Sequence, residues 1–190
     1  MDFIKADEIR DLLNDYGIEQ DTTDENHVFL RMSSGHSVQH LALSVAGTTC
    51  DAPKGADRQD ITEETLPSII KHLLYKLHNN QMVLVPVGKW RSIFDIVAFS
   101  LAENEDWQRI DAAASVELNS RDPLLADSGD LHLLEELFQA LVRDSETPDQ
   151  GLVLITVGLP VVLELVPGCG LRLSFGNEAI AAEVREVCTA

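Results

Sequence analysis

The chain has 190 residues, 45% of them hydrophobic, so it is long enough to bury a substantial core as one domain. Its 32 acidic residues outnumber 14 Lys and Arg, which gives a formal net charge of −18 at pH 7. Because phosphate backbones and anionic lipid surfaces are bound by clustered Lys and Arg, this charge argues against nucleic-acid and membrane partners.

The N-terminal region predicts a helix followed by a β-hairpin. Within residues 3–17, apolar side chains recur at helical spacing, at Ile4, Ile9, Leu12, Leu13 and Tyr16. Residues 28–32 and 38–45 are apolar runs on either side of Ser33-Ser-Gly35, which is typical of two paired strands.

Residues 47–60 contain Pro53, Gly55 and mixed charges, a composition typical of a linker. We therefore divide the chain into an N-terminal helix–hairpin unit at 1–46, this linker, and a main α+β domain at 61–190. The alternative is one continuous domain over residues 1–190.

The first half of the main domain predicts one helix and three strands. The helix is expected to begin near Thr65, because Pro67 then falls in its first turn, where a missing amide proton costs little. Pro86 predicts that the first strand lies at a sheet edge or contains a bulge, since proline cannot donate to a central ladder. The three strands are expected at about 82–88, 92–101 and 110–118.

The second half of the main domain begins with a helix and ends with another. The first helix is expected to bury Leu133, Leu134, Leu137, Phe138 and Leu141. Three strands should follow, at 151–158, 161–166 and 170–175, and then a C-terminal helix at 178–187. Gly151 to Leu171 is long enough to cross a bilayer as one helix, but Pro160, Pro167 and the many Val residues, together with Ile155, favour strands.

The main domain contains a loose internal repetition, in which 66–77 and 83–88 resemble 131–141 and 153–158. After the glycines that end these segments, Gly88 and Gly158, the pattern continues: Phe94 to Val97 in the first copy correspond to Leu163 to Val166 in the second. Duplication and a common helix–hairpin architecture both explain this pattern. The expected fold class is α+β, with antiparallel sheets built from helix-plus-hairpin units and helices packed on one face.

From Thr62 onward, the expected order is helix, three strands, helix, two or three strands, helix. In this order and in its acidity, the chain resembles the type III secretion chaperone-like fold over residues 62–188. That resemblance implies a small, usually dimeric protein that binds segments of a protein partner and does not catalyse a reaction. It identifies no functional residues.

Histidine and cysteine give little sign of a metal or catalytic site. His36 and His40 would share one face of a strand about 13 Å apart, too far to bind one ion, so neither a metal nor another cofactor is expected. Cys50, Cys169 and Cys188 have wide spacing, which favours free thiols in a reducing compartment over a disulfide framework. With no secretory signal visible at the start, we expect a cytoplasmic protein.

Two carboxylates and one cation–aromatic cluster remain as candidates. Asp95 and Glu164 interrupt apolar segments at matching places in the repeat, so each is either a half-buried acid or base or a charge on the wet face of a strand. Lys89, Trp90 and Arg91 follow a predicted turn. Trp90 is either an exposed contact for a partner or a lid over the end of the sheet.

Glycine-rich phosphate loops and Gly-x-Ser-x-Gly are both absent from the sequence. We therefore favour a non-catalytic protein-binding or chaperone-like module that forms a homodimer. The alternatives are an enzyme that uses Asp95 and Glu164 as acid and base on a small cationic or neutral metabolite, and a structural subunit of a larger assembly.

Overall fold

The computed structural model of the chain describes residues 1–22, 28–32, 38–45, 47–48, 51–77, 81–114 and 117–189. The helices are α1 (Ala6–Asp15), α2 (Leu66–Leu77), α3 (Trp90–Val97), α4 (Glu105–Ala113), α5 (Leu131–Asp144) and α6 (Glu178–Thr189). The strands are β1 (Asp2–Phe3), β2 (Ile18–Thr22), β3 (Val28–Met32), β4 (Gln39–Val45), β5 (Asp57–Ile61), β6 (Met82–Pro86), β7 (Leu124–Ala126), β8 (Leu152–Thr156), β9 (Val161–Val166) and β10 (Gly170–Phe175).

One sheet of eight strands, in the order β1-β7-β6-β8-β9-β10-β4-β5, organises the molecule. Its neighbouring strands are antiparallel except for the parallel pair β4–β5, while β2 and β3 form a separate antiparallel hairpin. The expected α+β class with a mostly antiparallel sheet is confirmed.

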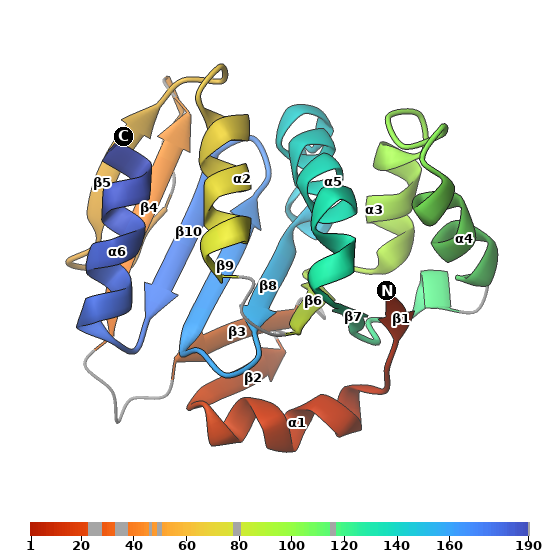
Figure 1. Cartoon of the computed structure of the whole chain (residues 1–190), viewed down its shortest axis with the longest axis horizontal. Helices are drawn as coiled ribbons and strands as arrows, with labels where there is room; N and C mark the ends of the chain where they lie inside the picture. Colours follow the sequence, from red (N-terminus) through yellow and green to blue (C-terminus); the bar gives the residue numbers. More distant parts are fainter. Residues whose placement is uncertain are drawn as a thin grey trace.

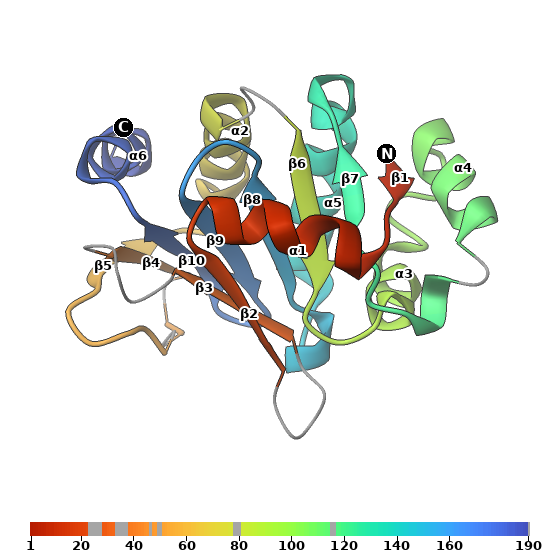
Figure 2. The ribbon, with the colours of Figure 1, turned by 90° about the horizontal axis from the view of Figure 1, so that it is seen from below.

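Helices α2, α3, α5 and α6 cover one face of the large sheet, with α4 beside α3 (Figure 1). The β2–β3 hairpin lies on the opposite face, and α1 runs along one end of the sheet (Figure 2). Ile9 of α1 and Leu30 of β3 belong to an apolar cluster with Val83, Val153 and Val162 on this second face. The expectation of helices on one face therefore holds for the later helices, and α1 is the exception.

The N-terminal strands pair differently from the sequence prediction. Strand β3 pairs with β2 and not with β4, and β4 enters the main sheet between β10 and β5. Strand β5 occupies part of the predicted linker. One sheet therefore contains strands from all three predicted segments, 1–46, 47–60 and 61–190.

Two predicted strands, at 92–101 and 110–118, are wrong, because helices α3 and α4 lie there. The buried side chains of α3 recur at helical spacing, at Trp90, Ile93, Phe94 and Val97. The Asn104 side chain caps α4 by accepting a hydrogen bond of 3.0 Å from the amide of Trp107. Residues 94–97 are helical and 163–166 extended, so this part of the expected repeat is also wrong.

The expected helices at α2, α5 and α6 and the expected strands at β6, β8, β9 and β10 are confirmed. Strand β6 is interior, contrary to the edge position expected from Pro86, but its pairing with β7 ends at Leu84. Proline therefore falls where that ladder has stopped. Gly151 to Leu171 forms strands and turns, and no helix in the described ranges has the length and apolar character to cross a membrane.

Candidate binding cavity

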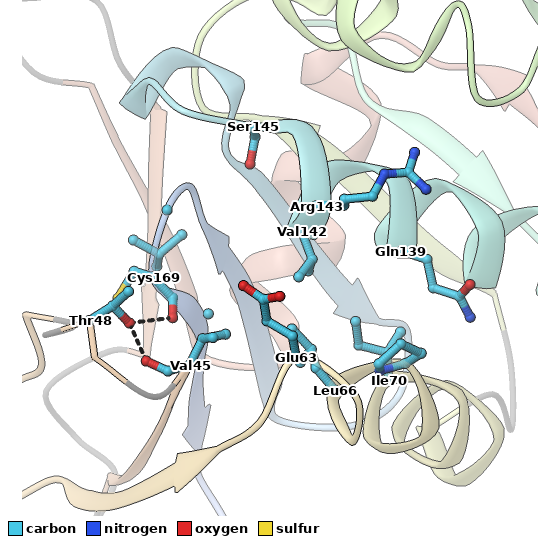
Figure 3. A pocket seen from close by; sticks show the side chains of 14 residues that line it. Val45, Thr48, Glu63, Leu66, Ile70, Gln139, Val142, Arg143, Ser145 and Cys169 are labelled. Atoms are coloured by element: carbon cyan, nitrogen blue, oxygen red, sulfur yellow. Dashed lines mark hydrogen bonds between the residues drawn. The ribbon is translucent and has the colours of Figure 1, made fainter.

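A cavity of about 490 Å³ opens where α2 begins, α5 ends and the chain turns from β9 into β10 (Figure 3). This volume lies in the range of small-molecule and side-chain pockets. Its apolar wall consists of Val45, Leu66, Pro67, Ile70, Val142 and Val166. Polar groups of Thr48, Glu63, Gln139, Arg143 and Ser145 surround that wall.

The start of α2 is held by two threonines that bond each other reciprocally. The Thr62 amide donates to Oγ1 of Thr65 over 3.1 Å, and the Thr65 amide donates to Oγ1 of Thr62 over 3.2 Å. This pattern satisfies amides that have no partner inside a helix. Glu63 lies between the two threonines, so their bonds fix the backbone from which its carboxylate reaches the cavity.

The opposite wall is the β9–β10 turn. Thr48 Oγ1 lies 2.6 Å from the carbonyl oxygen of Val45, to which it donates, and 3.1 Å from that of Cys169. Cys169 is disulfide-bonded, so the expectation of a free thiol is wrong for this residue, and Cys50 lies outside the described residues. Cys188 is a free thiol, and its burial raises its pKa to about 11.

The end of α5 brings an unusual hydroxyl to the cavity. Ser145 is the C-cap residue, and its amide donates to the carbonyl of Leu141 over 2.9 Å. Its side chain is 4% exposed, and within the described part of the chain its Oγ has no hydrogen-bond partner. Buried hydroxyls in proteins nearly always have a hydrogen-bond partner. The Ser145 hydroxyl therefore has the capacity to bond a ligand in the cavity.

The charge in the cavity lining that has no described partner is negative. Figure 3 shows the Glu63 carboxylate and the Ser145 hydroxyl pointing toward its middle from opposite sides, while the Arg143 guanidinium points away. Arg143 binds Asp144 at 2.6 Å, which raises the pKa of Arg143 and lowers that of Asp144. No described residue pairs with Glu63, and the carbonyl end of α5 adds partial negative charge.

A second cavity, of about 390 Å³, lies on the other face of the sheet and contains two polar pairs. Glu164 of β9 and Arg172 of β10 are directly opposed, and the guanidinium binds both carboxylate oxygens. His40 Nδ1 of β4 lies 2.9 Å from Ser174 Oγ of β10. These pairs satisfy one another across neighbouring strands, which is a structural arrangement.

Glu164→Gln is expected to lower the free energy of unfolding by about 1–3 kcal/mol, because it weakens the bidentate pair and leaves the Arg172 charge partly buried without its counter-charge. Glu183→Gln is the control, since Glu183 pairs with Lys76 at an exposed site and should cost less than about 1 kcal/mol. Urea denaturation followed by circular dichroism measures both. Equal stability of the wild type and Glu164→Gln would contradict the structural role.

His40 is expected to make stability depend on pH. Burial lowers its pKa from 6.5, so below that pH the unfolded chain binds more protons than the folded one. The stability that His40 contributes is complete above pH 6.5. It is lost as the pH falls from 6.5 toward and through the lower pKa that His40 has in the folded protein. Urea denaturation at a series of pH values between about 5 and 7.5 should show a stability that changes less with pH for His40→Gln than for the wild type, and equal slopes for the two would contradict this role of His40.

The remaining residues that the sequence singled out lie apart from the cavity. Asp95 is exposed on α3, so the expectation of a half-buried carboxylate in a strand does not hold for it. Trp90 is fully buried and donates from Nε1 to the carbonyl of Asp122 over 2.7 Å. Of the two positions predicted for Trp90, the structure therefore shows the one in the core. Lys89 and Arg91 are exposed on either side of it. His36 lies outside the described residues.

Sequence reasoning missed Glu63 and Ser145, the two polar groups that face each other in the cavity. The signal for Glu63 was the start of α2, where Thr62 and Thr65 frame it. Ser145 follows the predicted third helix, and a polar residue after a helix is too common to indicate a site. No group of three His, Cys, Asp or Glu side chains in the described ranges could hold a metal ion.

The fold and the cavity define an α+β protein with a mostly antiparallel sheet, helices on one face and a pocket at one end of that sheet. Against family models, curated proteins and solved structures, the chain has no match.

Proposed function

We propose that this protein is a non-catalytic binding module that holds a segment of a protein partner at the end of the sheet where the cavity opens. The observation that carries the proposal is the buried Ser145 hydroxyl, which has no described partner and lines a cavity with an apolar wall. An apolar wall with a few convergent polar groups is the usual design of a binding pocket.

Phe99 supports a protein partner over a small molecule. Its side chain is 93% exposed in the turn after α3, and it shares a shallow hollow with Ile96 and Arg143. Arg143 also lines the cavity, so the two hollows adjoin at the end of α5. Exposed aromatic residues beside a pocket are the usual anchors of protein interfaces.

The edges of the large sheet offer a poorer site for a partner strand. Strand β5 carries Asp57, Arg58 and Asp60, and Asp57 pairs with Arg185 of α6 at 2.7 Å. Charges along an edge strand oppose the addition of another strand. At the other edge, β1 has only two residues. We therefore propose the cavity, and not a sheet edge, as the site for the partner segment.

Selection of peptides displayed on phage against the full-length protein tests this function. We expect the selected peptides to lose at least tenfold in affinity for Glu63→Trp, which fills the cavity mouth, and several-fold for Phe99→Ala. Glu64→Trp is the matched control, since Glu64 is exposed next to Glu63 but does not line the cavity. If every peptide binds Glu63→Trp and Glu64→Trp equally, the proposed function is wrong.

A homodimer and a cytoplasmic location are part of the same proposal. Light scattering after size exclusion tests the dimer, and a monomeric mass across the concentration range would contradict it. The disulfide at Cys169 removes the support that free thiols gave to a reducing compartment. Alkylation of cell lysates at the moment of lysis would show whether Cys169 is oxidised in cells, and full oxidation would count against the cytoplasmic location, because cytoplasmic proteins rarely keep disulfides.

A further inference from the structure

We infer that the side chain of the partner that enters the cavity is a lysine. This inference rests on the proposed function and adds the chemistry of the segment that is recognised. It begins with charge: the cavity contains the Glu63 carboxylate, no described residue pairs with it, and the cation nearby, Arg143, is bound to Asp144. A cation from outside the chain completes this arrangement.

The cavity supplies several acceptors for an ammonium group. The Glu63 carboxylate accepts from one side, and the Ser145 oxygen faces it from the other. The last carbonyls of α5, a helix of 14 residues, have no partner within the helix, and its C-terminal end favours positive charge. An ammonium has three donors and no acceptor, which matches a site built from acceptors.

The apolar wall suits the rest of a lysine. Leu66, Ile70, Val142 and Val166 line the cavity between its polar groups. A four-carbon stem can lie against these side chains while its charged end reaches the acceptors, which is how lysine buries its methylene groups elsewhere. A purely apolar side chain would leave the Ser145 hydroxyl without a partner, and an acidic one would be repelled by Glu63.

Long-range attraction favours the same partner. The whole chain has a net charge of −18, so a basic segment is drawn toward it and an acidic one is repelled. Binding should therefore weaken as salt concentration rises.

The peptides selected above provide the test. We expect their consensus to contain one invariant lysine, and replacement of that lysine by norleucine, which keeps the stem and removes the charge, to weaken binding at least tenfold. In the protein, Glu63→Gln should weaken binding about tenfold and Ser145→Ala several-fold, whereas Glu64→Gln should leave affinity unchanged. Fluorescence anisotropy of labelled peptides measures each affinity.

The outcomes separate this inference from the proposed function. Peptides that need the open cavity, so that Glu63→Trp abolishes binding, but that bind equally well with norleucine or glutamate in place of lysine would overturn the lysine and leave the binding module standing. Peptides that ignore Glu63→Trp would overturn both. The midpoint of thermal unfolding is measured for each variant and compared with that of its control at Glu64. Equal midpoints mean that a loss of binding is not caused by a loss of structure.

Discussion

Gly170→Ala is expected to lower the free energy of unfolding by about 4 kcal/mol, a loss at the top of the range for single substitutions. Gly170 opens strand β10 with φ of +148°, a conformation that residues with a Cβ rarely adopt. A Cβ built at this position lies 2.1 Å from the carbonyl oxygen of Leu43 in the neighbouring strand. The backbone of β4 or β10 must therefore move, and the ladder between them must weaken.

Gly168→Ala is the matched control for this prediction. Gly168 also has positive φ, +64°, but nothing lies within 4 Å of the Cβ that alanine would add. Its replacement should cost only the backbone strain, about 1 kcal/mol. Urea denaturation of both variants separates close approach from strain. Equal losses for the two would show that β4 and β10 are not as close at this position as the structure has them.

Apolar spacing predicted those elements whose local pattern agrees with their place in the fold. Helix α5 buries Leu133, Leu134, Leu137, Phe138 and Leu141, as its sequence indicated. Helix α3 covers much of the segment 92–101, which is predicted as a strand and whose Ile and Val residues favour extended structure. The spacing of its buried residues was helical, and contacts such as that between Phe94 and Trp107 outweigh the local preference.

Strand pairing was the part of the fold that the sequence predicted least well. Proximity suggested that β4 pairs with β3, but β4 pairs with β10, far along the chain. In the structure, Leu41 to Ser44 are buried in succession, the pattern of a strand covered on both faces. Local sequence cannot name the partner of such a strand, because pairing depends on how the whole sheet assembles.

The cavity was even further from prediction. Its lining comes from the start of α2, the second half of α5, the end of β4 and the turn between β9 and β10. No spacing rule links these segments, and a serine after a helix is ordinary until its surroundings are known. The sequence therefore gives no location for the cavity.

Trp90→Ala is expected to lower the free energy of unfolding by about 3–5 kcal/mol, the usual loss for a fully buried aromatic residue. The indole ring is 0% exposed and meets Phe3 and Phe94 edge to face, with ring centroids 5.7 and 6.1 Å away. Because Phe3 belongs to β1 and Phe94 to α3, removal of the ring loosens the contact between the N-terminal strand and the helical face.

Trp90→Phe separates the contribution of the Trp90 hydrogen bond to stability from that of its aromatic ring. It keeps an aromatic side chain but removes the Nε1 donor of the 2.7 Å bond to the Asp122 carbonyl, which should cost about 1–3 kcal/mol. Lys89→Ala and Arg91→Ala, which change exposed neighbours, should stay within about 0.5 kcal/mol of the wild type. Urea denaturation followed by circular dichroism measures all four variants. If Trp90→Ala is as stable as the wild type but loses peptide binding, Trp90 is a partner contact after all, and the site belongs at the start of α3.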